Sequence, residues 1–190
     1  MMTALIPKEA FEQGILSEEY HERLLANMEQ YTKVASVIPH FLWESLAQYC
    51  GVEEVEWVKG AKKPTTEAGL LIVNKQSIPI EDKMMAMAAA FMRNYMDARV
   101  MVLQDVLDHL DNRTMPEPTV LLIPNFCLDG KEGSTTPWKV SGLLGMLYSR
   151  HTKNLKTVLY APKIETIAAI YGKTVADHVV GHYKIIGESL

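Results

Sequence analysis

The stretch GLLIVNKQSIPIEDKMMAMAAAFMRNYMDARVMVL, residues 69–103, contains the pattern from which the architecture of this chain is predicted. It begins with a short apolar run, passes through a polar turn into a long segment rich in methionine and alanine, and ends in a second apolar run. Short apolar runs that alternate with longer helical segments are typical of a parallel β-sheet with crossover helices. We expect the methionine-rich helix to face the core, in preference to forming a groove for a partner.

The same alternation continues to the end of the chain, which has no internal repeat. Five strands are expected, at Gly69–Val73, Val100–Leu103, Val120–Ile123, Thr157–Tyr160 and Tyr183–Ile186. Helices are expected between them, at Glu81–Asp97, Asp105–Leu110, Pro137–Arg150 and as a pair over Lys163–Val180. The sequence therefore predicts a three-layer α/β domain with a five-stranded, mostly parallel sheet.

A short helical region is expected before this domain. Ser17 can cap a helix whose apolar residues recur at three- and four-residue steps, among them Tyr20, Leu24, Met28 and Tyr31. A second short helix is expected at about Phe41 to Gln48, and the polar run Lys59–Thr66, which contains a glycine and a proline, looks like a linker. The expected organisation is a helical region at 1–58, a linker at 59–66 and the α/β domain at 67–190.

Composition narrows the function classes. The 19 basic and 23 acidic residues give a formal charge of -4, so any contact with nucleic acid has to come from a local patch. No apolar stretch approaches the roughly 20 residues of a membrane span, and the N-terminus does not resemble a signal peptide, so we expect a cytoplasmic protein without a membrane contact. Cys50 and Cys127 are far apart, which favours two buried free thiols over a disulfide or a zinc site.

The turn after the first strand lacks the residues that bind a nucleoside triphosphate. A P-loop needs glycines that let backbone N–H groups surround the phosphates, followed by lysine and a hydroxyl residue. The turn that starts at Asn74 contains no glycine, Pro79 removes an N–H donor, and Glu81 and Asp82 place negative charge where phosphates would lie. Lys83, like Lys75, can reach a phosphate, but a solvated surface residue is the favoured interpretation.

The magnesium site is also missing from the sequence. ATP hydrolysis by P-loop enzymes needs an acidic residue at the end of a hydrophobic strand, usually followed by a glutamate. The strand Val120–Ile123 ends instead in Pro124 and Asn125, which supply neither a metal ligand of that kind nor a good base. Asp129 is more plausibly a turn residue.

Two further patterns imitate known sites. Gly172-Lys173-Thr174 looks like the end of a P-loop but follows a helical segment. His178 and His182 have the i, i+4 spacing of metal ligands, yet Gly181 lies between them and no carboxylate pattern completes a site. Paired surface histidines are the favoured interpretation, and neither a metal nor another cofactor is expected.

The order of segments from about Ile38 to Gly187 resembles the bacterial helicase-loader and transposition-helper (DnaC/IstB-like) branch of the AAA+ ATPases. The most similar segments are AMAAAFMRNYMDARVMVLQDVLDHL, PTVLLIPNFCLDG and LKTVLYAPKIETIAAIYGKTVADHV. The resemblance implies a P-loop NTPase-like fold. The family's polar sensor then falls near Ala161 or Pro162, and its arginines correspond to Thr174 and His178. Four motifs have lost charges or hydrogen bonds together, so we expect a degenerate member of the family, a pseudo-ATPase and not an enzyme.

The resemblance also implies partners, namely a replicative helicase, single-stranded DNA and further copies of the chain. Tyr20, Leu24, Met28 and Tyr31 could form the helicase contact, although packing within the chain is the favoured alternative. Lys153, Lys156 and Lys163 form a basic cluster that could meet DNA, with Tyr160 as an aromatic neighbour. The leading hypothesis is a non-catalytic adaptor or inhibitor that binds a replicative helicase or its loader. An unorthodox ATP-dependent helicase loader and a DNA-binding transposition accessory protein remain as alternatives.

Overall fold

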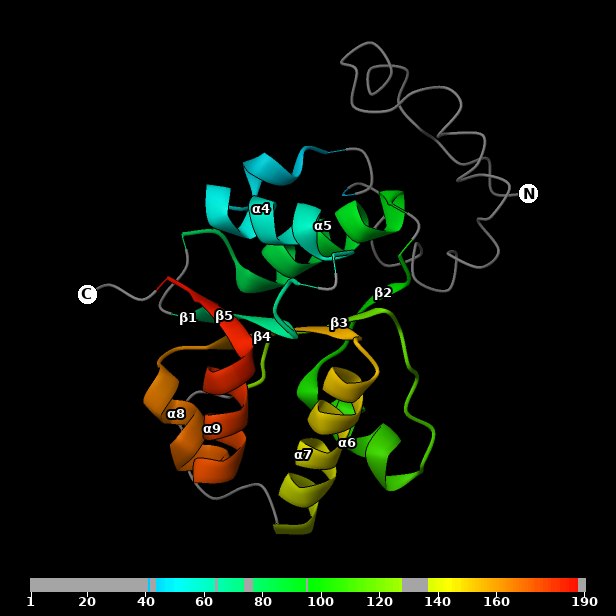
Figure 1. Ribbon diagram of the computed structural model, residues 1–190, viewed down its shortest axis with the longest axis vertical. Helices are drawn as coiled ribbons and strands as arrows, with labels where there is room; N and C mark the ends of the chain where they lie inside the picture. The colour runs from blue at the N-terminus through cyan, green and yellow to red at the C-terminus, as the bar shows by residue number, and fades with distance from the viewer. Residues whose placement is uncertain are drawn as a thin grey trace.

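A five-stranded parallel sheet forms the centre of the molecule (Figure 1). The structure is a computed structural model, and it describes residues 41, 44–63, 65–73, 77–94, 96–127 and 137–187. The strands are β1 (Gly69–Val73), β2 (Ala98–Val100), β3 (Val120–Ile123), β4 (Lys156–Ala161) and β5 (Tyr183–Ile186). Their order across the sheet is β2-β3-β4-β1-β5, and every neighbouring pair is parallel.

Strands β1 and β3 are apolar along their whole length because helices cover both faces of the sheet. All residues of β1 and β3 are buried, and alternate residues point to opposite faces. Leu70 and Ile72 belong to one core, whereas Leu71 and Val73 belong to the other. A continuous apolar run of this kind was the pattern that predicted a parallel sheet.

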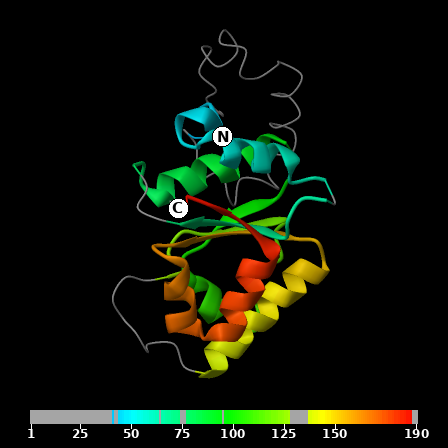
Figure 2. The ribbon, with the colours of Figure 1, turned by 60° about the vertical axis from the view of Figure 1, so that its left-hand side comes forward.

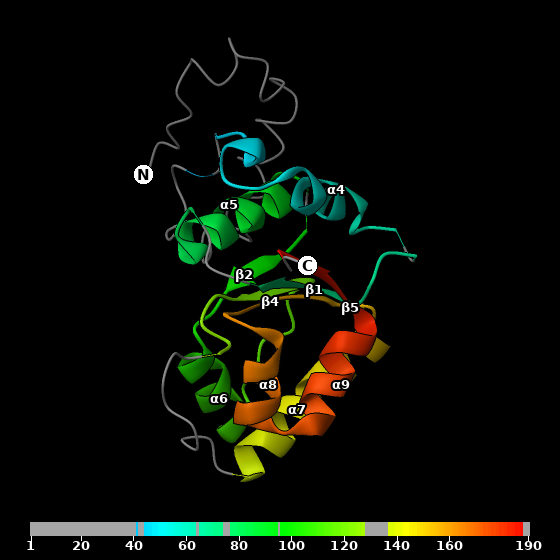
Figure 3. The same ribbon diagram turned by 90° about the vertical axis from the view of Figure 1, so that its left-hand side faces the viewer.

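Among the described residues, two α-helices cover one face of the sheet and four cover the other (Figures 2 and 3). The first core contains side chains of α4 (Val52–Gly60) and α5 (Ile80–Arg93), next to the 3-10 helix η2 (Leu46–Gln48). The second core contains side chains of α6 (Leu103–Asp111), α7 (Pro137–Thr152), α8 (Ile164–Tyr171) and α9 (Lys173–His182). The methionine-rich helix α5 does face the core, with Met84, Met87 and Met92 buried. The structure confirms the predicted three-layer α/β fold.

Between β1 and β5 the connecting helices change once from one face of the sheet to the other. This change determines where a ligand site is expected. From β1 the chain crosses to the edge strand β2 through α5 on one face, and it then returns through β3, β4 and β5 with all connecting helices on the other face. Open α/β sheets bind ligands outside the carboxyl ends of the strands, where such a reversal occurs. The expected position is therefore the turn after β1, next to the ends of β3 and β4.

Some predicted boundaries are wrong. The second strand is Ala98–Val100 and not Val100–Leu103, because Leu103 already begins α6. Of the short helix expected over Phe41 to Gln48, the described residues contain 3-10 structure at Phe41 and η2. A nine-residue helix, α4, follows in the segment VEEVEWV, whose element type was left open within the predicted helical region. Because Trp57 and Val58 share a core with α5, α4 packs with the α/β domain despite lying before the predicted linker.

Candidate functional site: the carboxyl edge of the sheet

The turn between β1 and α5 occupies the position of a phosphate-binding loop. Residues 74–76, which include Asn74 and Lys75, lie outside the described residues, and the chain is described again from Ser77. Pro79 is the residue before α5 and caps it with no side-chain hydrogen bond. Glu81 and Asp82 lie in the first turn of α5, where carboxylates interact favourably with the partial positive charge of the helix end. A triphosphate at this helix end would therefore meet two negative side chains.

Lys83 does not reach toward this turn as a free cation, because its ammonium is held by α4. Its Nζ lies 2.7 Å from Oε1 and 3.0 Å from Oε2 of Glu54, and the two side chains are only 8% and 4% exposed. Glu54 also accepts a hydrogen bond of 2.6 Å from the backbone N–H of Gly51 at the start of α4. The pair thus joins α4 to α5 inside the first core, and the predicted solvated surface position of Lys83 is wrong.

A cavity of about 500 Å³ lies beside this ion pair. Its wall is formed by the turn between η2 and α4, by Ser77 and Ile78 before α5, and by Ile186 at the end of β5. Cys50 also lines it, and burial, followed by the negative charge of Glu54, raises the pKa of its thiol to about 12. A thiol with this pKa remains protonated near neutral pH and is a poor nucleophile.

The end of β3 has a structural role in place of a magnesium ligand. Pro124 is buried directly after the strand. The side-chain Oδ1 of Asn125 accepts a hydrogen bond of 2.7 Å from the backbone N–H of Leu103, the first residue of α6. This bond satisfies one of the N–H groups that have no partner within their own helix. Asn125 therefore caps α6 from a neighbouring loop.

The end of β4 offers no polar sensor at either predicted position. Ala161 is buried as the last residue of β4, and the half-buried Pro162 follows it. Of the two positions that correspond to the family's arginines, Thr174 is exposed and His178 is buried. Nearby, the hydroxyl of Tyr171 donates a hydrogen bond to the backbone oxygen of Phe126 and connects α8 with the turn after β3.

The three predicted DNA-binding lysines do not present a common charged surface. Lys153 forms an ion pair with Glu117, and Lys163 is exposed just before α8. Lys156 is buried, and its Nζ donates to the backbone oxygens of Thr66 and Glu67 at 2.9 and 3.1 Å. Lys156 therefore holds the chain segment before β1 in place, and its ammonium is not available to a phosphate.

Several other predicted features can be located. The predicted helicase-contact residues Tyr20, Leu24, Met28 and Tyr31 lie outside the described residues, as does Asp129. Cys50 and Cys127 are buried free thiols, as predicted. Within the described part of the chain, no helix is both long and apolar enough to cross a membrane.

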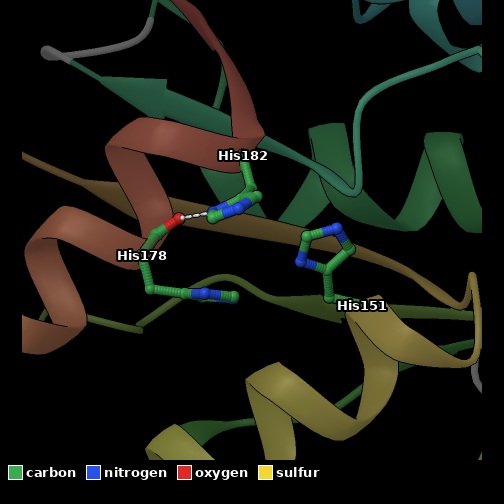
Figure 4. Close-up of side chains that lie close together, drawn as sticks. All are labelled: His151, His178 and His182. Atoms are coloured by element: carbon green, nitrogen blue, oxygen red, sulfur yellow. Dashed lines mark hydrogen bonds between the residues drawn. The ribbon is translucent and has the colours of Figure 1, made fainter.

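The predicted surface pair of histidines is different in the structure. His182 is exposed, but His178 is buried, and a third histidine that the sequence did not indicate, His151 of α7, lies beside them (Figure 4). Sequence spacing could not reveal His151 because it lies on a different helix. The absence of a nearby carboxylate pattern was therefore not a sufficient reason to set the pair aside.

These features define an α/β fold of the P-loop NTPase type, in which Lys83 and Asn125 make contacts within the protein. No protein-family model matches the sequence, and no curated protein is detectably similar to it. Among solved structures, the chain is similar in fold to structures of the replication initiator DnaA and to that of the DnaC helicase loader.

The AMPPCP-bound DnaA from Aquifex aeolicus aligns with a TM-score of 0.57 and 11% identity, over 75% of this chain and 48% of that chain. A replication initiator DnaA bound to AMPPCP and single-stranded DNA aligns with a TM-score of 0.56 and 13% identity, over 76% and 50%. The DnaC helicase loader aligns with a TM-score of 0.53 and 14% identity, over 75% of this chain and 94% of that chain. This chain spans about half the length of the DnaA structures, and the likeness establishes the fold alone.

Proposed function

We propose that this protein is a non-catalytic, helicase-loader-like interaction protein of DNA replication, which binds a replicative helicase or its loader as an adaptor or inhibitor. The fold shared with DnaA and DnaC supports the replication setting. The observation that carries the non-catalytic part is the buried ion pair of Lys83 with Glu54. The nearest described lysine to the phosphate-loop position is thereby neutralised and committed to packing, while Glu81 and Asp82 add negative charge at the helix start.

The structural roles of Pro124 and Asn125 support the same proposal. A magnesium ion needs oxygen ligands, and an acid at this strand end normally provides one through water. Here the first position is a buried proline, and the amide oxygen of the second is committed to the N–H of Leu103. A protein that keeps the fold without these ligands can still present the surfaces by which the fold associates with other chains.

Nucleotide binding is tested directly by thermal unfolding with and without ATP and Mg²⁺. We expect no shift, with an active loader of the same host as the positive control. A ligand present at about 100 times its Kd stabilises a protein by about 2.7 kcal/mol, so a bound nucleotide would be visible. A reproducible rise in Tm, or phosphate release above the blank, would favour the alternative of an unorthodox ATP-dependent loader.

The partner is tested by affinity capture with the purified full-length chain, offered separately to the replicative helicase and to the helicase loader of the host. We expect one of the two to be retained. A helicase-loading assay on single-stranded DNA then separates an adaptor, which increases loading, from an inhibitor, which reduces it. Retention of neither protein would contradict the proposal.

A salt titration of single-stranded DNA binding distinguishes the DNA-binding alternative from the proposed helicase or loader interaction. A protein that neutralises phosphates loses affinity for DNA steeply as the salt concentration rises. If the chain bound single-stranded DNA with such a dependence and captured neither helicase nor loader, the accessory-protein hypothesis would replace the present one. Lys163→Ala is the variant to use, because Lys163 is exposed, whereas a Lys156 variant would disturb the fold.

A further inference from the structure

Three histidines from two helices converge on the face of the sheet that α6 to α9 cover (Figure 4). His178 and His182 lie four residues apart on α9 and therefore share one side of that helix, and His151 reaches toward them from the last turn of α7. The ring centroids of His151 and His182 are 4.4 Å apart, and those of His178 and His182 are 4.8 Å apart. One ring nitrogen from each histidine lies within 4.8 Å of the other two.

His178 is the unusual member of this cluster. Its side chain is buried, with 2% of the residue exposed, and neither Nδ1 nor Nε2 has a hydrogen-bond partner among the described residues. A buried polar group without a partner costs free energy, and nearly all such groups in folded proteins are satisfied. The aromatic ring of Tyr148 packs at 4.3 Å on one side of the imidazole and offers it no acceptor. Coordination of an ion by one of its nitrogens would satisfy this ring.

His182 already has the tautomer that a metal ligand needs. Its Nδ1 lies 2.9 Å from the backbone oxygen of His178. Because a carbonyl oxygen can only accept, Nδ1 carries the proton, and the lone pair is left on Nε2. Metal-bound histidines typically donate their second ring N–H to a backbone carbonyl or a carboxylate, which fixes the ring orientation.

The protonation state of the cluster is consistent with metal binding. Burial, followed by the neighbouring His182 and His151, lowers the pKa of His178 to about 4. Burial, followed by the neighbouring His182 and Lys156, also lowers the pKa of His151. Neutral imidazoles are the form that binds a metal, so His178 and His151 are in that form near neutral pH.

We propose that His151, His178 and His182 bind one divalent transition-metal ion, with Zn²⁺ as the best match, and that this ion connects α7 to α9. Three imidazole donors suit zinc and its first-row neighbours, and they do not suit Mg²⁺ or Ca²⁺, which take oxygen ligands. Zinc–nitrogen bonds of about 2.0 to 2.1 Å place tetrahedral ligand atoms about 3.3 Å apart. On binding, the ligand nitrogens therefore have to come closer to one another by about 1.5 Å. Rotation of the exposed side chain of His182 and the half-buried side chain of His151 allows this approach.

The site lies at the opposite end of the sheet from the turn that replaced the phosphate loop. His151 precedes β4 and His182 is the last residue before β5, so both mark the amino ends of strands. A three-histidine set leaves one tetrahedral position for water, and the described neighbourhood supplies no fourth ligand. The role of the bound ion is to hold α7 and α9 together. This role is independent of any nucleotide chemistry at the carboxyl edge of the sheet.

The test uses the full-length chain after treatment with a chelator and dialysis. Zn²⁺ is added and followed by isothermal titration calorimetry and by Tm, and Co²⁺ is added in a parallel experiment because its visible absorption reports nitrogen ligands in tetrahedral geometry. We expect one ion per chain and a rise in Tm on Zn²⁺ addition. Absence of stoichiometric binding would overturn the proposal.

Variants assign the ligands. His182→Ala and His151→Gln should each lower the affinity for Zn²⁺ by more than about 100-fold, because loss of an outer-shell partner alone costs about 10- to 100-fold. Both side chains are at least partly exposed, so these variants should still fold, which a His178 variant does not guarantee. His109→Ala is the matched control, because His109 lies on α6 outside the cluster and should leave binding unchanged. Binding that persists unchanged in His182→Ala would show that other residues hold the ion and would overturn the proposal.

Discussion

Two polar side chains near the carboxyl edge of the sheet make contacts within the protein. Lys83 binds Glu54, and Asn125 binds the N–H of Leu103. In both cases a polar atom that could meet a ligand meets the protein's own backbone or an opposite charge. These contacts make direct predictions, because each can be removed by a single substitution and compared with a variant that keeps it.

The Glu54–Lys83 pair predicts a strong coupling in stability. Lys83→Met should lower the free energy of unfolding by about 3 to 5 kcal/mol, because it leaves Glu54 charged and buried without its partner. The double variant Glu54→Leu with Lys83→Met should lose far less, about 1 kcal/mol for the hydrogen bond that Glu54 accepts from Gly51. Urea unfolding of the two single variants and the double variant measures the coupling.

Lys63→Met is the control for this cycle, since Lys63 is exposed and its replacement should change stability by no more than about 0.5 kcal/mol. Equal losses in Lys83→Met and in the double variant would show that the pair is not coupled. The expected loss of stability also affects how activity assays are interpreted. A Lys83→Ala variant could lose phosphate release because it unfolds and not because a catalytic group is missing, so this variant cannot identify a catalytic lysine.

Asn125 predicts a difference between two small substitutions. Asn125→Ala should destabilise the protein by about 1 kcal/mol, because the N–H of Leu103 loses its acceptor. Asn125→Asp keeps an acceptor at the start of α6 and adds a charge that the helix end favours, so it should retain stability. Thermal unfolding distinguishes the two variants. A loss in Asn125→Asp as large as that in Asn125→Ala would contradict the capping role.

Among helices and strands, the inner strand β1 is packed closely at its first residue. It lies between β4 and β5, and at Gly69 the backbone oxygen of Thr157 and the ring of Tyr183 leave no room for a side chain. An added Cβ would lie 2.4 Å from that oxygen and 2.2 Å from the ring. The close approach explains why this strand begins with glycine.

Two glycine substitutions should consequently have opposite effects. Gly69→Ala should destabilise the protein by about 1 to 3 kcal/mol or more, because the contact with backbone cannot relax by side-chain rotation. Gly145→Ala, on an exposed face of α7 with no atom within 4 Å of the new methyl group, should stabilise it by about 0.5 to 1 kcal/mol. Chemical denaturation measures both. If Gly69→Ala were neutral, the register of β1 against β4 would be wrong.

The helix α4 shows what local sequence could not reveal. Its residues VEEVEWV alternate in a way that indicates neither helix nor strand, and its hydrophobic side is weak. The helix is stabilised by distant contacts, since Glu54 binds Lys83 and the ring of Trp57 packs edge-on against Phe91 of α5. Such pairs join residues far apart in the chain, so a propensity argument that considers neighbours alone does not find them.

For the molecule as a whole, the sequence was informative about the sheet and much less so about the site. β1, β3 and β5 have the predicted bounds, and β1 and β3 were predictable because a short uninterrupted apolar run allows few alternatives. The second strand was misplaced because the cap that starts α6 at Leu103 comes from Asn125 in another loop. The histidine cluster was missed for a similar reason, since His151 comes near His178 only after α7 and α9 pack on the same face.

Stability of the whole chain should depend on pH through His178. Its pKa is about 4 in the folded protein against an ordinary value of 6.5, so below pH 6.5 the unfolded chain binds a proton that the folded chain does not. The stability that neutral His178 contributes is fully present above pH 6.5 and is lost as the pH falls to about 4. The free energy of unfolding decreases by at most about 3 kcal/mol over this range. The groups facing this ring are His151, His182, Tyr148 and Tyr183.

This dependence is measured by urea unfolding between pH 7 and pH 4 in the presence of a chelator, for the natural chain and for His178→Leu. Carboxylates titrate in both proteins, so their contribution cancels in the difference. We expect the stability of the natural chain relative to His178→Leu to fall as the pH decreases. A difference that does not change with pH would show that His178 is accessible to protons in the folded state.

Parallel strands all point the same way, and this gives the protein two chemically separate ends. One end carries the turns that follow β1, β3 and β4, and the other carries three imidazoles. A paramagnetic ion such as Co²⁺, held by those imidazoles, would be a reporter group fixed at the amino ends of β4 and β5. Distances measured from this ion could locate the proposed partner on the protein, without a label at the contact itself.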